Sequence, residues 1–302
     1  MTTPVILDCD PGHDDAIALL LALASPEIEL VGVTTTHGNQ TLDKTTDNAL
    51  RLLALVDRTH VPVAVGAERP LVRELHVAAH VHGESGLDGP ELPARASEPV
   101  EQSAVDFLVD HVTPETVLVA VGPLTNVAQS LERGIRPRRI VLMGGAIGEG
   151  NMTPAAEFNI WADPEAAQRV FHSGLDVTMI GLDVTHDALL TPAWADRFRE
   201  AGRVGTFVAE LVDFFKQYHA RTYGWDGAPV HDAVALAHAF RPGIVTTERL
   251  NVEVELESEL TRGRTVVDRW HRTDREPNAE VGVGVDADAF FELLLERIAT
   301  YG

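Results

Sequence analysis

The sequence has few cysteines, few basic residues and no long apolar run. Cys9 is the only cysteine, so no intrachain disulfide can form, and a lone cysteine is typical of a reducing cytoplasm. Lysine and arginine together number 24 against 46 acidic residues, which gives a net charge of −22. Nucleic-acid-binding proteins usually carry a basic stripe, so we expect no nucleic-acid partner.

Membrane association is not expected either. The longest uninterrupted apolar run is Ala16–Ala24, whereas a helix that spans a bilayer needs ~20 apolar residues. The N-terminus, MTTPVILDCD, lacks the basic region of a signal peptide. We therefore predict a cytoplasmic protein with no membrane partner.

The rest of the composition is that of a globular protein, with 45% hydrophobic residues. We find no internal repeat and no linker, so residues 1–302 are expected to form one domain. Apolar segments with strand character alternate with helical segments. Strands are predicted at 5–7, 28–34, 61–65, 116–121, 140–143, 177–182 and 252–256, the last paired with 265–270. Helices are predicted at 14–24, 41–56, 100–111, 123–132, from 163 onward, within 192–239 and at 286–301.

This alternation predicts an α/β fold with a mostly parallel, open central sheet flanked by helices. Ligands of such folds bind at the carboxyl ends of the strands. The polar, turn-rich segment 67–100 is too long for a simple connection, and we expect it to be functional.

Residues 4–24, PVILDCDPGHDDAIALLLALA, contain a dense group of carboxylates. Asp8 and Asp10 end the first strand, Pro11-Gly12 forms a turn, and Asp14 and Asp15 open a helix. A helix N-terminus favours one or two carboxylates, but all four would repel one another unless a cation or a proton neutralises them. Because Ca²⁺ and Mg²⁺ prefer oxygen ligands, we predict a metal site.

The segment Asp8–Ala16, DCDPGHDDA, resembles the DxDPGxDDA signature of the inosine–uridine-preferring nucleoside hydrolases. Polar motifs after later strands match the same family in order, so the resemblance covers nearly the whole chain. It implies a nucleoside-hydrolase-like open sheet. It also implies an enzyme of purine or pyrimidine salvage that hydrolyses the N-glycosidic bond of ribonucleosides to give ribose and a free base.

The resemblance also implies the site residues. The Ca²⁺ ligands would be the carboxylates of Asp10, Asp15 and Asp232 and the backbone carbonyl of Val121. The ribose hydroxyls would be bound by Asp14, Asn39, Asn151, Glu157 and Asn159. His82 and His231 would lie near the nucleobase, whereas His13, His60 and His271 are interpreted as structural histidines.

Glycoside hydrolysis passes through an oxocarbenium-like sugar. In this mechanism Asp10 accepts a proton from water, Asn159 favours the positive charge on the sugar, and His231 protonates the leaving base. Base preference stays open between purine, pyrimidine and both, although the run HGESGLDG at 82–89 resembles that of bacterial members of the family, some of which are selective for pyrimidines. Residues 214–229 should line the base, with Tyr218, His219, Arg221, Tyr223 and Trp225 as candidates. The family implies a homo-oligomer, either a tetramer or a dimer, and a small-molecule nucleoside substrate.

Two other functions are compatible with parts of this pattern. A DxD after the first strand also occurs in phosphatases of the haloacid dehalogenase type, which need a lysine beside the phosphoryl group. Lys44 and Lys216 are the only lysines, and both fall within predicted helices. A non-catalytic, Ca²⁺-dependent nucleoside- or ribose-binding protein is the second alternative.

Overall fold

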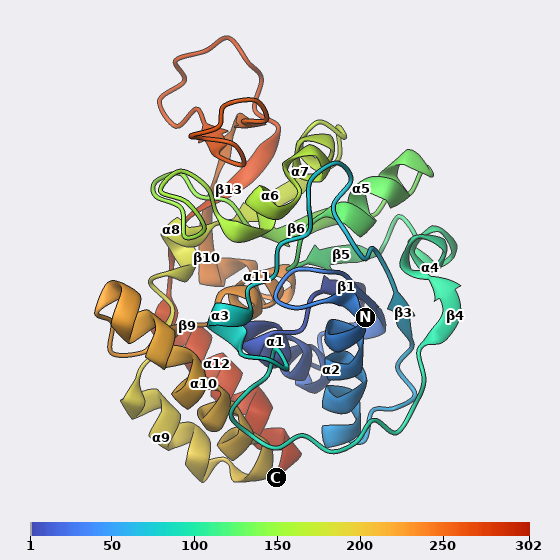
Figure 1. The fold of residues 1–302 in the computed structure, drawn as a ribbon, viewed down its shortest axis with the longest axis vertical. Helices are drawn as coiled ribbons and strands as arrows, with labels where there is room; N and C mark the ends of the chain where they lie inside the picture. Colours follow the sequence, from blue (N-terminus) through green and yellow to red (C-terminus); the bar gives the residue numbers. More distant parts are fainter. Residues whose placement is uncertain (1) are drawn as a thin grey trace.

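The computed structural model describes residues 2–302, and its centre is a nine-stranded sheet (Figure 1). The strands of this sheet are β1 (Thr3–Cys9), β2 (Ile28–Thr35), β3 (Val63–Val65), β4 (Val100–Ser103), β5 (Val117–Ala120), β6 (Arg139–Met143), β7 (Val177–Ile180), β10 (Val245–Leu250) and β13 (Ala279–Val285). Their order is β10-β13-β7-β6-β5-β1-β2-β3-β4. Every neighbouring pair is parallel except β10 and β13. The predicted mostly parallel, open α/β sheet is confirmed.

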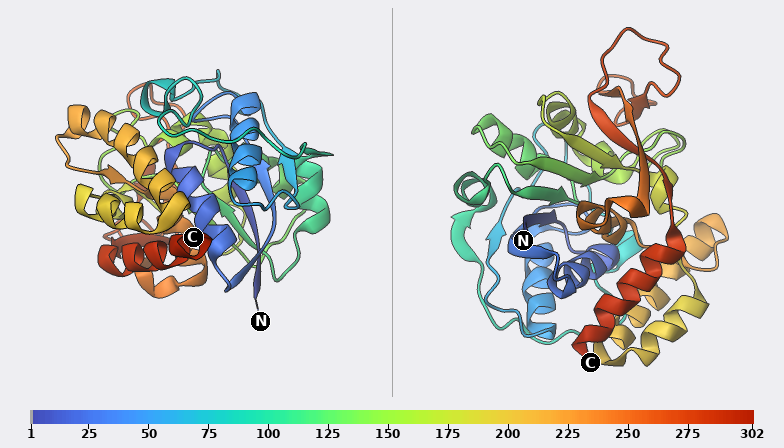
Figure 2. Two further views of the ribbon diagram at one scale, coloured as in Figure 1. Left: turned by 90° about the horizontal axis from the view of Figure 1, so that it is seen from below. Right: turned by 180° about the vertical axis from the view of Figure 1, so that it is seen from behind.

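Helices cover both faces of the sheet (Figure 2). One face packs against α1 (His13–Ala24), α2 (Leu42–Leu55), α9 (Pro192–Glu200), α10 (Gly202–Tyr223), α11 (His231–Phe240) and α12 (Ala287–Ile298). The other face packs against α4 (Ala104–His111), α5 (Thr125–Glu132) and α7 (Pro164–Phe171). The two hydrophobic cores therefore lie on opposite sides of one sheet.

Strand β1 shows why its sequence forms a central strand. Val5 and Leu7 belong to the core beneath α1, whereas Ile6 belongs to the opposite core, as the two-residue period of a strand requires. Both faces are buried from Val5 onward, so residues 5–7 are all apolar.

The direction in which successive strands are added to the sheet reverses between β1 and β5. From β1 the chain adds β2, β3 and β4 on one side, and it then returns to place β5, β6 and β7 on the other. Such a reversal leaves a crevice at the carboxyl ends of the two strands, where α/β proteins bind ligands. Asp10 follows β1 and Val121 follows β5, so the predicted metal ligands lie at this crevice.

Several elements differ from the sequence-based predictions. Residues 100–103 form β4 at the sheet edge rather than the start of a helix, because Ser103 caps α4 by accepting a hydrogen bond from the Asp106 N–H (3.1 Å). Strands β10 and β13 were not predicted. Segment 67–100 contains a short helix, α3 (Ala79–His82).

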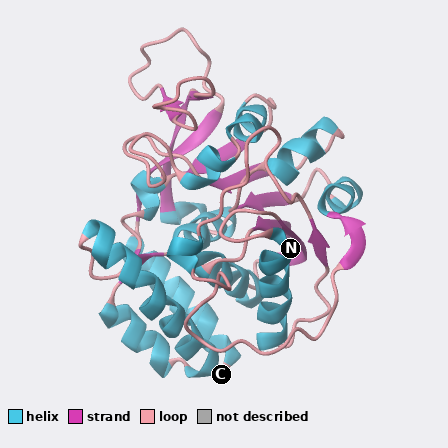
Figure 3. Cartoon of the chain, in the orientation of Figure 1, coloured by secondary structure: helices cyan, strands magenta, loops and turns pink. Residues whose placement is uncertain are grey.

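The remaining short elements surround the site or extend from the body. They are α6 (Phe158–Ala162), α8 (Leu182–Thr185), η1 (Pro242–Ile244) and η2 (Ala299–Tyr301), with β8 (Leu189–Leu190) paired to β9 (Ala228–Pro229). Strands β11 (Val252–Val254) and β12 (Thr265–Val267) pair as predicted and begin an arm that projects from the body (Figure 3). Within residues 2–302, no helix combines the length and the hydropathy needed to cross a bilayer.

Helix α1 supplies a test of the core, because Leu20 is fully buried between the sheet and the surrounding helices. We expect Leu20→Ala to lower the free energy of unfolding by about 2–5 kcal/mol, through lost apolar contact and the cavity that remains. Leu260→Ala is the matched control: this leucine is 84% exposed, so the change should be within ~0.5 kcal/mol. Urea unfolding of both variants measures the difference, and equal values would contradict the described packing.

Candidate active site

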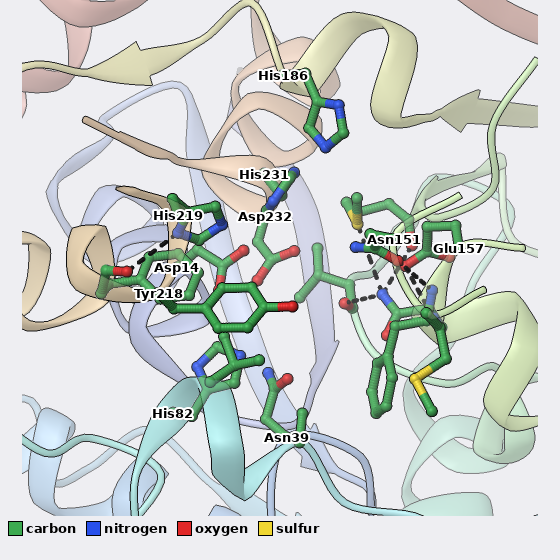
Figure 4. A pocket seen from close by; sticks show the side chains of 18 of the residues that line it. Asp14, Asn39, His82, Asn151, Glu157, His186, Tyr218, His219, His231 and Asp232 are labelled. Atoms are coloured by element: carbon green, nitrogen blue, oxygen red, sulfur yellow. Dashed lines mark hydrogen bonds between the residues drawn. The ribbon is translucent and has the colours of Figure 1, made fainter. Parts of the chain in front are cut away.

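A pocket opens at the carboxyl ends of β1, β2, β5 and β6 (Figure 4). Asp14 and Asp232 lie in its middle, Asn151 and Glu157 on one side, and Tyr218 and His219 on the other. The lining also includes Asn39, Ala78, His80, Val81, His82, Val121, Met143, Met152, Phe158, Asn159, His186, Phe215, Tyr223 and His231. All seven predicted substrate-binding residues line this pocket.

The turn between β1 and α1 is held together by Asp15. Its carboxylate accepts hydrogen bonds from the backbone N–H groups of Asp10 (3.1 Å) and Gly12 (3.0 Å) and from the Asn39 side-chain amide (2.8 Å). The two backbone groups belong to the turn that precedes α1, where helix geometry leaves N–H groups without helical partners. Asp15 therefore fixes Asp10 and Asn39 around the N-terminus of α1.

Asp14, Asp15 and Asp232 form a buried acidic cluster in which one carboxylate oxygen of each lies within 4.8 Å of the others. Burial, followed by the charge of Asp15, raises the pKa of Asp14 to about 8. Burial and the charges of Asp14 and Asp15 raise the pKa of Asp232 well above its usual range. Three carboxylates this close and this buried need a proton or a cation between them.

Asp10 lies beside this cluster in a close-fitting cradle. Its Oδ2 accepts a hydrogen bond from the Asn39 backbone N–H at 2.6 Å, whereas its Oδ1 is buried with no hydrogen-bond partner among residues 2–302. A Cβ on Gly38 would lie 2.0 Å from Oδ2, and a Cβ on Gly122 would lie 2.4 Å from Oδ1. Burial and the charge of Asp15 raise the pKa of the Asp10 carboxyl well above its ordinary value.

The donor set at the crevice suits a hard cation. The cluster offers carboxylate oxygens, and Asp10 Oδ1 is an unpaired buried oxygen beside it. The Val121 carbonyl accepts a hydrogen bond from the Asn159 side-chain amide (2.7 Å) and retains a second lone pair. No sulfur or imidazole belongs to the cluster, so the chemistry of these residues fits Ca²⁺ or Mg²⁺ better than Zn²⁺.

The loop after β6 presents a second set of polar groups. Glu157 caps α6, because its carboxylate accepts hydrogen bonds from the backbone N–H groups of Asn159 (2.8 Å), Ile160 (3.1 Å) and Gly145 (2.8 Å). Burial raises the pKa of Glu157 to about 7. The Asn151 Oδ1 accepts a hydrogen bond from the Phe158 N–H (2.9 Å), which leaves the Asn151 NH₂ group free to donate.

The orientation of the Asn159 amide follows from its partners. Its Nδ2 lies 2.7 Å from the Val121 carbonyl and 3.2 Å from the Met143 carbonyl. Carbonyl oxygens only accept, so the NH₂ group must face them. The Asn159 Oδ1 is therefore the atom left for a ligand in the pocket.

Aromatic and histidine side chains form the opposite side of the pocket. The Nδ1 of His231 lies 2.7 Å from the Thr185 hydroxyl, and burial together with neighbouring histidines lowers the pKa of His231 well below its usual value. Tyr223 lines the pocket, and Trp225 stacks behind it with ring centroids 4.5 Å apart. His186, which the sequence analysis did not single out, also lines the pocket.

One residue from the predicted base-binding segment and one strand-end aspartate have other roles. Arg221 bonds the Gln217 carbonyl on an exposed part of α10, outside the pocket. Asp183, which follows β7, does not line the pocket. Its carboxylate accepts hydrogen bonds from the Ile147 and Gly148 N–H groups and so holds the loop after β6. The sequence contains only a weak indication for His186. It lies shortly after β7, the strand that Asp183 also follows, and ligands of this fold class bind at the carboxyl ends of strands.

His82 ends the short helix α3, and its side chain is buried against a second histidine. Its Nδ1 lies 3.2 Å from the backbone nitrogen of His13 and 3.1 Å from the His13 Nδ1. His13, which the sequence analysis interpreted as structural, is thus in direct contact with a residue of the pocket.

Comparisons with known proteins agree with this arrangement. The model of the inosine-uridine preferring nucleoside hydrolase family matches residues 5–292. A pyrimidine-specific ribonucleoside hydrolase, RihA, from Klebsiella pneumoniae is 52% identical over 310 residues, and the match covers 100% of both chains. RihA from Salmonella arizonae is 51% identical over 311 residues and also covers 100% of both chains.

Solved structures show the same likeness in three dimensions. A purine-preferring ribonucleoside hydrolase from Gardnerella vaginalis superposes with a TM-score of 0.92 at 37% identity, covering 99% of this chain and 98% of the other. A plant nucleoside hydrolase superposes with a TM-score of 0.89 at 34% identity, covering 99% of each chain.

Proposed function

The chain belongs to the inosine-uridine preferring nucleoside hydrolase family, and we propose that it is a pyrimidine-preferring, Ca²⁺-dependent member. It is an enzyme of the ribonucleoside hydrolase class, as its relatives over the full length are. We propose in addition that residues 1–302 act as one nucleoside-hydrolase domain. We expect a cytoplasmic homo-oligomer, a dimer or a tetramer, because the family resemblance implies one.

The observation that carries the proposal is the buried acidic cluster in the middle of the pocket. Asp14, Asp15 and Asp232 converge within 4.8 Å, and the unpartnered Asp10 Oδ1 is buried beside them. We propose Asp10, Asp15, Asp232 and the Val121 carbonyl as the Ca²⁺ ligands. Asp14 belongs to the same cluster and faces the pocket. When bound, such an ion supplies Lewis acidity to a water and offsets the charge of the carboxylates.

Hydrolysis requires a general base, a protein side chain that accepts a proton while water adds to the C1′ atom of the ribose. We propose Asp10 for this role. Its Oδ2 is fixed by the Asn39 N–H, which leaves Oδ1 to take the proton. The close approach of Gly38 and Gly122 restricts the carboxylate to this position. Because the carboxylate of this general base is already oriented, the reaction does not have to bear the entropic cost of orienting it.

The ribose would lie against the loop after β6. The Asn151 NH₂ group donates to a hydroxyl, whereas Asp14, Asn39 and Glu157 accept from others. The Asn159 Oδ1, freed by the two carbonyl contacts of its NH₂ group, places a negative dipole toward the pocket. A dipole with this orientation favours the positive charge that develops on the sugar as the glycosidic bond breaks.

The electron pair of that bond passes to the leaving nitrogen of the nucleobase, which takes up one proton; this uptake balances the proton that Asp10 removes from the water. We propose His231 and His82 as the groups nearest the base. Burial keeps His231 neutral, so it begins the reaction as an imidazole rather than an imidazolium. With its Nδ1 beside the Thr185 hydroxyl, the Nε2 is the atom that meets the base.

A pyrimidine preference is supported by the degree of identity. The relatives named pyrimidine-specific are 51–52% identical to this chain, whereas the purine-preferring structure is 37% identical. We propose that Tyr218, His219 and Tyr223 line the base side of the site, since all three line the pocket.

The phosphatase alternative loses support from the positions of the lysines. The Lys44 ammonium bonds the Glu84 carbonyl on an exposed face, and the Lys216 ammonium bonds Asp213 (2.6 Å). Neither lysine lines the pocket, so neither is placed to stabilise a phosphoryl group.

Metal removal tests the cofactor. Exhaustive chelation should abolish the release of ribose from uridine, and Ca²⁺ should restore it better than Zn²⁺, because all proposed ligands are hard oxygens. A reducing-sugar assay measures this, with phosphate release from a phosphoester as the control for the phosphatase alternative. Full activity in verified metal-free protein would contradict the proposal, and uridine binding without ribose release would favour the non-catalytic binding protein.

Replacement of the proposed base gives a second test. Asp10→Asn should lower kcat by at least ~10²-fold, the low end for loss of a general base, while the far-ultraviolet circular dichroism stays that of the native fold. A variant with near-native kcat would show that another group accepts the proton of the water.

The two histidines give a third test, because a purine and a pyrimidine present their basic atoms differently. We expect His82→Ala and His231→Ala to change kcat/KM for inosine and uridine by unequal factors, since that ratio isolates effects on the leaving base. His60→Ala, at an exposed position, is the control and should change neither. Equal losses on both substrates would mean that neither histidine distinguishes the bases.

A further inference from the structure

His82 reaches the pocket through one ring nitrogen only. Its Nδ1 faces His13, at 3.2 Å from the backbone nitrogen and 3.1 Å from the His13 Nδ1. Its Nε2 has no hydrogen-bond partner within residues 2–302 and is not fully enclosed by protein. Because His82 lines the pocket, Nε2 is the atom available to a nucleobase.

The side chain of His13 is held on three sides. Its Nε2 lies 2.8 Å from the Asp88 carbonyl oxygen, which can only accept, so the His13 proton is on Nε2. Its ring stacks on Phe214 and on Phe215, each with centroids 5.2 Å away and nearly parallel planes.

Asp88 belongs to the loop that directly follows His82. The Asp88 carboxylate accepts hydrogen bonds from the backbone N–H groups of Glu84 (3.0 Å) and Ser85 (3.1 Å), and so closes this loop on itself. The hydrogen bond from His13 to the Asp88 carbonyl then ties the closed loop to the first residue of α1. Helix α1 also carries Asp14 and Asp15, so the loop and the acidic cluster share one rigid support.

Two proton arrangements are compatible with these distances. In the first, the His13 peptide N–H donates to the His82 Nδ1, and the His82 proton is on Nε2; the two bare Nδ1 atoms then face each other at 3.1 Å with no hydrogen between them. In the second, His82 Nδ1 carries the proton and donates to the His13 Nδ1, but this hydrogen then meets the peptide hydrogen of His13. A peptide N–H is a permanent donor, whereas an imidazole can hold its proton on either nitrogen.

We propose that His13 is a positioning residue for His82: its peptide N–H keeps the His82 proton on Nε2, and its side chain anchors the loop that follows His82. His82 then offers a hydrogen-bond donor to the base, which suits a carbonyl oxygen beside the glycosidic nitrogen, as pyrimidine nucleosides have. The assignment of His82 to the base rests on the proposed function, whereas the contact between the two histidines does not.

Nuclear magnetic resonance tests the proton position without any substrate. The ¹⁵N shifts of a neutral histidine distinguish the protonated from the bare ring nitrogen, and the His82 signals are identified by their loss in His82→Ala. We expect a protonated Nε2 and a bare Nδ1 in the full chain. A protonated Nδ1 would overturn the inference even if uridine is hydrolysed, and failure to hydrolyse uridine with a protonated Nε2 would overturn only the proposed function.

A double-mutant cycle tests the anchoring. His13→Phe keeps the stacking on Phe214 and Phe215 but removes the bond to Asp88, and we expect kcat/KM for uridine to fall about tenfold or more, as misplacement of an oriented group does. His13→Gln, whose amide can still donate to Asp88, should recover part of the loss. In the His82→Ala background, His13→Phe should add little, because His13 acts through His82.

Two measurements separate this role from general damage. His111→Phe replaces a histidine that stacks on Phe107, and neither residue lines the pocket; this variant should leave kcat/KM unchanged. Thermal unfolding shows whether the His13 variants are folded at the assay temperature. Independent, multiplicative losses from His13→Phe and His82→Ala in folded protein would show that His13 does not act through His82, and would overturn the anchoring.

Discussion

The repulsion among buried carboxylates is the constraint on which the site depends. Asp10, Asp14, Asp15 and Asp232 are gathered where β1, α1 and α11 meet, and burial raises the pKa of each. The fold tolerates this arrangement because backbone N–H groups before α1 bond to Asp15 and the Asn39 N–H bonds to Asp10. The remaining negative charge must be offset by a cation or by protons, and that requirement links the stability of this turn to the chemistry of the pocket.

The parallel sheet explains how distant parts of the chain meet at this turn. Strands β1 and β5 lie side by side where the chain order reverses, so the segments after them face one crevice. Helix α11 brings Asp232 into the same place by packing along α1. The loop after β6 reaches the opposite rim, where the Asn159 side-chain amide donates to the Val121 carbonyl and so joins this rim to the segment that follows β5.

Much of the fold could be predicted because central strands and helices have clear local patterns. The β1 segment is apolar on both faces and ends in carboxylates. The α/β class could be predicted because apolar strand segments alternate with helical segments along the chain. The edge strand β4 was misread as helix, since three of its four residues are exposed and polar and it pairs along one edge only. Strand β13 was missed because its glycines lower strand propensity, whereas pairing with β7 and β10 stabilises it. In the site, motif residues were identifiable, but the contact between His13 and His82 joins residues far apart in sequence and left no local pattern.

Direct measurement of Ca²⁺ binding tests the central claim, that the acidic cluster is a cation site, independently of catalysis. Metal-free protein would be dialysed to equilibrium against radioactive Ca²⁺, with Asp232→Asn and the exposed Asp274→Asn examined in parallel. We expect one saturable site per chain, with an affinity that is unchanged in Asp274→Asn and weakened at least about tenfold in Asp232→Asn, since a buried ligand charge is lost. Absence of saturable binding, or equal affinity in Asp232→Asn and the native chain, would contradict it.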